Sequence, residues 1–284
     1  MPFPIPRSKN TNIRLKTMKR DFTQCYVSPA LPHFKKGFQE KWDLKEYHDP
    51  LAPSIFFGMY GPQDAQIFIE HKGPKLMIWG GNDMHPPQLN LFKQESLKED
   101  VFTFATPGEM VTTFDQFDIP YKIFYLTIKD YSLFEPTPLG ENIYVYVGQP
   151  DNIRLEYFDY QNIIEPLIYT FGEDRIIRVT ENNALTSKEL KEKYYDDCFV
   201  YVKPNKRGGN TTMWELAHMG RRTIGKGQQG LSNFIEYQDL NHLIDLIVEE
   251  SQHIGTIRNN ISDDVKKMFI GEEWLSLDYW INKK

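Results

Sequence analysis

Cysteine is scarce in this chain, which excludes folds that disulfide bonds hold together. Only two cysteines, Cys25 and Cys198, occur among the 284 residues. Disulfide-stapled secreted domains carry many more, so the count fits a reducing compartment. Cys198 opens the apolar run "CFVYV", which predicts a buried thiol. Spacings of cysteine and histidine that are typical of zinc sites are also missing.

Long apolar segments and an excess of positive charge are missing as well. No stretch approaches the roughly 20 apolar residues of a membrane-spanning helix, and the first residues lack the apolar segment of a signal peptide. The net charge of -6 argues against a nucleic-acid partner, because phosphates select a basic surface. We therefore expect a cytoplasmic, monomeric protein that has no membrane span and binds no nucleic acid.

Two common catalytic motifs do not occur. The segment "GKGQQG" at 225–230 has the glycines of a phosphate-binding loop but lacks the Lys-Ser or Lys-Thr ending. A nucleophile-elbow pattern is absent too. The hydrophobic fraction of 40% and the aromatic fraction of 14% nevertheless indicate a globular chain with an aromatic-rich core.

Short apolar segments alternate with amphipathic segments from residue 54 onward. The alternation stops at 129–142, a stretch with prolines and no periodicity that predicts a linker, and then resumes. Strands separated by helices indicate parallel sheets with helices on their faces. The expected strands are 54–60, 75–81, 101–106, 121–128, 143–148, 175–180 and 198–204, with a short strand around Thr223.

This pattern predicts an α/β fold of two Rossmann-like, doubly wound domains that face each other across a cleft. We expect the first domain at 1–135 and the second at 136–265. Residues 266–284, rich in aromatics, are expected to form a helical segment that packs back toward the first domain. Open α/β sheets bind ligands at the carboxyl ends of their strands. Candidate site residues are therefore those in loops that follow strands.

The segment "NKRGGNTTMWELAHMGRRTIGKG" at 205–227 follows such a strand. Two glycines precede a helix that is expected to begin near Thr211, so a ligand could approach backbone N–H groups closely. Helix N-termini attract phosphate groups. An alternative is a capping box, in which Thr212 caps the helix and Glu215 reaches back to the backbone N–H of the cap. The pattern alone leaves both interpretations open.

The longer stretch "LTSKELKEKYYDDCFVYVKPNKRGGNTTMWELAHMGRRTIGKG" (185–227) resembles the donor-site region of GT-B glycosyltransferases. Glu215 matches the ribose-binding Glu of that family. Gly209, Asn210 and Thr211 match its phosphate-facing helix start. Many retaining members carry a second Glu eight positions before the ribose Glu, where this chain has Arg207, so the stereochemistry stays open. The resemblance covers the second half of the chain, and the first half only by architecture.

A nucleotide-sugar donor needs further contacts, and the second half of the chain offers several. Thr212, Lys203, Arg207 and Arg154 are candidates for the diphosphate. Thr180 and Glu181, in "RVTENN", are candidates for the base. For each of these residues the alternative is a solvated surface position.

The acceptor side is expected in the first half of the chain. A general base there would activate the acceptor hydroxyl. We favour Asp83 slightly over His85, both in "WGGNDMHPP"; Asp83 could instead cap the next helix and His85 could be a surface residue. Gly58, Tyr60 and Gly61, in "GMYG", would let the acceptor approach, or form a tight strand–helix turn.

The resemblance implies a glycosyltransferase that moves a sugar from a UDP- or GDP-sugar, UDP-xylose among the candidates, to a glycan or glycoprotein hydroxyl. The first domain would hold the acceptor and the second the nucleotide-sugar. No cofactor beyond the donor is implied, and no metal is strictly required. The short, aromatic-rich chain also resembles small glycosyltransferases of large DNA viruses, which would place it in the host cytoplasm. The alternatives are a sugar-nucleotide epimerase and a non-catalytic protein that binds nucleotide-sugars or glycans.

Overall fold

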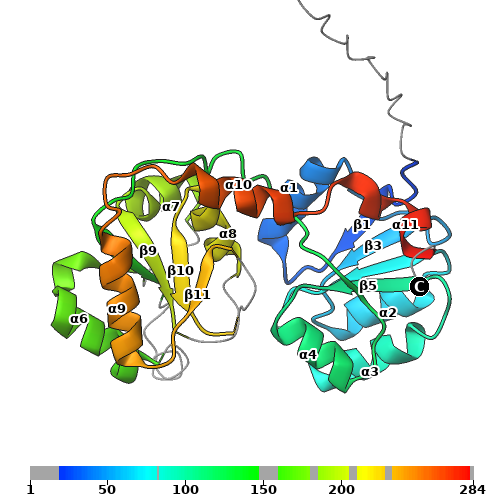
Figure 1. Ribbon diagram of the computed structural model, residues 1–284. Helices are drawn as coiled ribbons and strands as arrows, with labels where there is room; N and C mark the ends of the chain where they lie inside the picture. Colours follow the sequence, from blue (N-terminus) through cyan, green and yellow to red (C-terminus); the bar gives the residue numbers. More distant parts are fainter. Residues whose placement is uncertain are drawn as a thin grey trace, which may run out of the picture.

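A computed structural model describes residues 19–81, 83–146, 159–179, 185–204, 210–227 and 232–281. These residues form two parallel sheets, each covered by helices on both faces (Figure 1). The predicted α/β class is therefore confirmed. None of the helices within the described ranges is long and apolar enough to span a membrane.

The first sheet has six strands in the order β2-β1-β3-β4-β5-β6. Neighbouring strands run parallel, and most are apolar on both faces because helices cover both sides. In chain order, β2 is added on one side of β1, whereas β3 and the later strands are added on the other side. The strand order therefore changes direction between β1 and β3. The strands are β1 (Gln24–Val27), β2 (Lys45–Glu46), β3 (Ser54–Phe57), β4 (Lys75–Ile78), β5 (Val101–Ala105) and β6 (Lys122–Ile123).

The helices of the first half of the chain that cover this sheet are α1 (Pro32–Trp42), α2 (Pro62–Glu70), α3 (Pro86–Glu95) and α4 (Glu109–Gln116). The first three carry proline in their first turn, where the missing N–H costs no helical hydrogen bond. Helix α1 packs on one face through Phe38, whereas α2, α3 and α4 pack on the other through Phe68, Phe92 and Phe114. The first sheet is thus doubly wound.

The second sheet has five parallel strands in the order β11-β10-β9-β7-β8. Its strand order changes direction between β7 and β9, and every residue of β9 is buried. The strands are β7 (Asn142–Tyr146), β8 (Ile176–Val179), β9 (Cys198–Lys203), β10 (Arg222–Gly225) and β11 (Phe234–Glu236). The helical segments are η1 (Tyr160–Ile164), α6 (Glu165–Phe171), η2 (Glu173–Arg175), α7 (Ser187–Leu190), η3 (Lys191–Tyr195), α8 (Asn210–His218) and α9 (Leu240–Ser251).

The C-terminal part of the chain returns from the second sheet to the first, as Figure 1 shows in orange and red. It forms α10 (Asn259–Met268), η4 (Glu272–Leu275) and α11 (Leu277–Ile281). Trp274 and Trp280 are buried in the core of the first sheet, and the Trp274 ring meets Trp42 edge-on with 5.1 Å between centroids. The proposed domain boundaries themselves stay a prediction.

Several local expectations differ from the structure. The strand expected at 121–128 is confined to β6, followed by an isolated bridge between Tyr125 and Phe269. The sequence predicts Ser187 as the cap of a helix at 187–197, but Thr186 caps α7. It also predicts Pro107 in the first turn of a helix at 107–117, but α4 begins at Glu109. Helix α1 and strands β1, β2 and β11 were not expected, because they are short or lie among prolines without a clear period.

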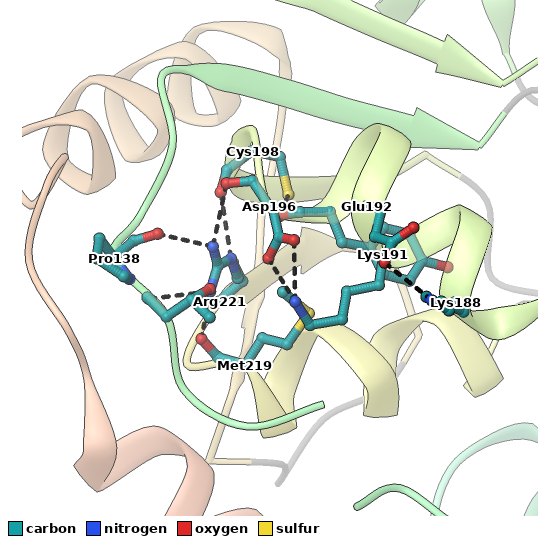
Figure 2. Close-up of polar contacts among 10 residues, drawn as sticks. Pro138, Lys188, Lys191, Glu192, Asp196, Cys198, Met219 and Arg221 are labelled. Atoms are coloured by element: carbon teal, nitrogen blue, oxygen red, sulfur yellow. Dashed lines mark hydrogen bonds and ion pairs between the residues drawn. The ribbon is translucent and has the colours of Figure 1, made fainter. Parts of the chain in front are cut away.

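Arg221 follows the turn that ends α8, a position where the helix dipole favours a cation. Its side chain has no exposed surface. The guanidinium donates to the carbonyls of Cys198 (3.2 Å), Thr137 (3.1 Å) and Pro138 (2.8 Å), and also to those of Met219 and Asp196 (Figure 2). It thereby joins the segment between the sheets to the start of β9 and the end of α8.

Replacing Arg221 by Met is expected to destabilise the protein by about 3 kcal/mol or more, because hydrogen bonds to a charged group contribute ~1.5–3 kcal/mol each. The thermal unfolding midpoint should fall by roughly 6 °C or more. Lys188→Met is the control, since Lys188 is 70% exposed and 3.7 Å from Glu192; such surface pairs contribute about 0–1 kcal/mol. Equal thermal unfolding midpoints for the two variants would contradict the stabilising role of the Arg221 hydrogen bonds.

Candidate functional site

Lys203 lies where the strand order of the second sheet changes direction. It ends β9, which pairs with β7 so that Val202 lies beside Val145. Open α/β sheets bind ligands in the crevice at this point, outside the carboxyl ends of the strands. Lys203 is only 3% exposed, and burial lowers the pKa of its ammonium to about 8, while the negative charge of Glu109, in α4 of the first sheet, opposes this.

Glu215 lies in the second turn of α8 and is 2% exposed. One carboxylate oxygen accepts a hydrogen bond from the Lys129 ammonium, and the other accepts one from the Tyr195 hydroxyl at 2.8 Å. Helix α8 begins at Asn210, so Thr212 lies inside the helix and is not its cap. The capping-box interpretation of Thr212 and Glu215 is therefore wrong.

Helix α8 is buried on more sides than its sequence indicates. One apolar stripe was expected, with Glu215 and His218 on another face, but every residue from Met213 to Gly220 is buried. The His218 ring stacks on Tyr131 with 4.6 Å between centroids, and burial lowers the pKa of His218. Tyr131 comes from the segment between the sheets, and this covering segment left no signal in the helix pattern.

Lys129 was missed by the sequence analysis. Its ammonium pairs with Glu215 and also donates to the Ser187 hydroxyl at 3.0 Å. The same ammonium lies 5.2 Å from the centroid of the Phe134 ring. No local motif marks this lysine, because it meets Glu215 across 86 positions of sequence.

Other donor candidates are placed only in part. Thr211 and Thr212 are half-buried in the first turn of α8. The backbone of Asn210 opens that helix, and its side chain lies outside the described atoms. Five further candidates fall outside the described residues: Arg154, Thr180, Glu181, Arg207 and Gly209. Their roles stay predictions.

On the first sheet, Asp83 follows β4 and has no exposed surface. Its carboxylate accepts a hydrogen bond from the Met59 backbone N–H at 2.8 Å, which ties the loop after β4 to the loop after β3. Burial raises the pKa of the Asp83 carboxyl, and hydrogen bonds from backbone N–H groups oppose the rise. The N-cap of α3 is His85, so the alternative in which Asp83 caps that helix is wrong.

His85 is exposed, and its side chain makes no capping hydrogen bond to α3. Its backbone N–H donates to the Asp83 carbonyl at 2.9 Å. The His85 side chain is thus exposed, whereas the Asp83 side chain is buried. The catalytic role of either residue stays a prediction.

The loop after β3 is a tight strand–helix turn. Gly58 has φ of 87°, a conformation that favours glycine. A Cβ on Gly80 would lie 2.4 Å from the Tyr60 hydroxyl, so the loops after β3 and β4 pack closely. Gly61 is the N-cap of α2. An acceptor role for Gly58, Tyr60 and Gly61 stays a prediction.

Asp64 is a second residue that the sequence analysis missed. Its buried carboxylate accepts hydrogen bonds from the Tyr26 hydroxyl (2.7 Å), the Ser28 hydroxyl (2.9 Å) and the backbone N–H groups of Tyr60 and Gly61. It therefore organises the carboxyl ends of β1 and β3, where the strand order of the first sheet changes direction. An Asp at the third position of a helix, after Gly-Pro, was the available signal.

Metal-binding side chains are not clustered in the described part of the chain. Among those residues, no group of three or more His, Cys, Asp or Glu side chains is arranged to hold a metal ion. The expectation that no metal is required stays a prediction.

The chain was compared with known proteins. No protein-family model matches it. No curated protein matches either. Among solved structures, it is similar to a variant of TarM from S. aureus, solved in complex with fondaparinux, alpha-GlcNAc-glycerol and UDP. The TM-score is 0.50 and the identity 14%, over 81% of this chain and 55% of the TarM chain.

That likeness shows the fold alone, and this chain spans about half the length of TarM. The α/β architecture of two parallel sheets is thus shared with a protein that was solved with UDP bound. The resemblance to viral glycosyltransferases finds no support in these comparisons.

The buried position of Asp83 generates a stability prediction. Asp83→Ala should lower the free energy of unfolding by about 1–3 kcal/mol, because the buried Met59 N–H loses its partner. The matched control is Asp263→Ala, on the exposed face of α10, which should change it by less than about 0.5 kcal/mol. Thermal or urea unfolding measures both, and an unchanged midpoint for Asp83→Ala would rule out its structural role.

Proposed function

We propose that the chain is a GT-B glycosyltransferase, in which the second sheet binds the nucleotide of a nucleoside-diphosphate sugar and the first sheet binds the acceptor. One observation carries the proposal. A buried lysine, Lys203, and a buried carboxylate, Glu215, flank the same strand-to-helix connection, at the point where the second sheet changes strand order. This is the ligand position of open α/β sheets.

The chemistry of these groups suits a nucleoside diphosphate. The Lys203 ammonium would offset the charge of the diphosphate, together with the backbone N–H groups at the start of α8. The Glu215 carboxylate would accept hydrogen bonds from the ribose hydroxyls. Transfer would then depend on positioning of the acceptor and on stabilisation of the departing diphosphate.

Two independent likenesses support this assignment. The residues at 185–227 resemble the donor region of GT-B glycosyltransferases, and the fold is similar to that of TarM, which was solved with UDP and alpha-GlcNAc-glycerol. UDP-sugars are therefore the first donors to test, followed by GDP-sugars. The acceptor would be the hydroxyl of a glycan or glycoprotein.

We propose His85 as the general base and Asp83 as the residue that positions its loop. A base must touch the acceptor hydroxyl. His85 is exposed, whereas the Asp83 carboxylate is fully buried and bound to the Met59 N–H. This reverses the slight preference for Asp83 that the sequence suggested.

Incubation with UDP- and GDP-sugars tests the function. We expect slow release of the nucleoside diphosphate by hydrolysis and faster release when a glycan acceptor is added. His85→Ala should remove the acceptor-stimulated release while the nucleotide still binds in a thermal-shift assay. An isomerised donor would indicate the epimerase instead, and binding without any turnover would indicate a binding protein.

The lowered pKa of Lys203 predicts how nucleotide affinity depends on pH. The ammonium is charged below about pH 8 and loses its charge as pH rises through that value, so the affinity for UDP should fall above about pH 8. Because a bound anion favours the charged form, the affinity should level off at a higher pH. Lys203→Arg keeps its charge and should flatten the profile between about pH 7 and 9.5. Parallel profiles for the two proteins would remove Lys203 from the diphosphate site.

A further inference from the structure

The carboxylate of Glu215 is held by two side chains from outside its own helix. Lys129, in the segment between the sheets, donates to one oxygen, and Tyr195, in η3, donates to the other at 2.8 Å. Glu215 is 2% exposed and Lys129 is 19% exposed. Burying a carboxylate is costly unless it is paired and hydrogen-bonded, and these two donors meet both needs.

The two donors leave part of the carboxylate available. An ionised carboxylate offers about four lone-pair positions. Among the described residues, Lys129 and Tyr195 each donate to a different oxygen, so with respect to these residues each oxygen can accept one more hydrogen bond. Two neighbouring hydroxyl groups of a ribose carry the two donors that this arrangement would accept.

In another lysine–carboxylate pair beside the second sheet, a single ammonium contacts both oxygens of the carboxylate. The Lys191 ammonium lies 2.9 Å from both oxygens of Asp196 (Figure 2), and its side chain is 18% exposed. Asp196 is 35% exposed and lies between η3 and β9, where its carbonyl accepts a hydrogen bond from Arg221, which follows the turn that ends α8. Lys129 and Lys191 are therefore similarly exposed, and each pairs with a carboxylate. They differ in that Lys129 contacts one oxygen of its partner, whereas Lys191 contacts both oxygens.

We propose that Lys129 is a positioning residue for ribose recognition: with Tyr195 it fixes the Glu215 carboxylate so that its two remaining acceptor positions face the 2′- and 3′-hydroxyls. This inference rests on the proposed function. The Lys129 ammonium is itself oriented by the Ser187 hydroxyl at 3.0 Å and lies over the Phe134 ring. The segment between the sheets thus contributes to the nucleotide site.

Affinities of the full chain for UDP and 2′-deoxy-UDP test the proposal, because their ratio reports contacts with the ribose 2′-hydroxyl and does not depend on the fraction of folded protein. The wild-type chain should bind UDP at least about tenfold more tightly, a difference worth one hydrogen bond to a charged group. Lys129→Met should weaken UDP binding about tenfold and leave 2′-deoxy-UDP nearly unchanged, so that the ratio falls toward one. Glu215→Gln is the reference variant and should lower the ratio in the same direction.

A second variant and a control complete the experiment. Tyr195→Phe keeps the ring that packs against Tyr144 and removes only the hydroxyl, and it should also lower the ratio. Lys191→Met should keep the wild-type ratio. A wild-type ratio in Lys129→Met, or tighter UDP binding by that variant, would overturn the positioning role. Equal affinity of the wild-type chain for both nucleotides would contradict the ribose site itself, and with it the proposed function.

Discussion

The buried guanidinium of Arg221 is the contact on which the candidate site depends. Its N–H groups are directed at main-chain carbonyls from three parts of the chain: the segment between the sheets, the start of β9 and the end of α8. Because a guanidinium is a rigid, planar fork of five donors, it fixes these carbonyls relative to one another. Lys129 belongs to the first part and Glu215 to the third, so Arg221 limits how far the two can separate.

Buried carboxylates organise both sheets, but with different kinds of donor. Asp64 and Asp83 both accept hydrogen bonds from backbone N–H groups of the loop after β3, and Asp64 accepts two more from the hydroxyls of Tyr26 and Ser28. Within the described part of the chain, Glu215 accepts hydrogen bonds from two side chains, those of Lys129 and Tyr195. Main-chain donors are fixed by the fold, whereas side-chain donors can move when a ligand competes for the carboxylate. The first pair therefore suits a structural role and Glu215 suits a ligand site.

Much of the fold follows from local sequence, and much of the site does not. Strands such as β3, β4 and β9 are apolar runs between turn residues, so their pattern was sufficient. Lys203 and Glu215 were predicted as candidates because a strand, two glycines and a helix lie together in sequence. The pairing of Glu215 with Lys129 spans 86 positions, and the burial of Arg221 requires carbonyls more than 80 positions away. Tertiary contacts of this range leave no periodic signal.

The chain passes between the two sheets twice, and both connecting segments contact α8, the helix that carries Glu215. The outgoing segment contributes Tyr125 and the returning segment contributes Phe269, and the two are joined by a β-bridge. Both rings meet Trp214 of α8 edge-on, with centroid separations of 5.1 and 5.0 Å. Packed aromatic contacts resist continuous deformation. A change in the relative position of the sheets would therefore act on Trp214 of α8, one residue from Glu215.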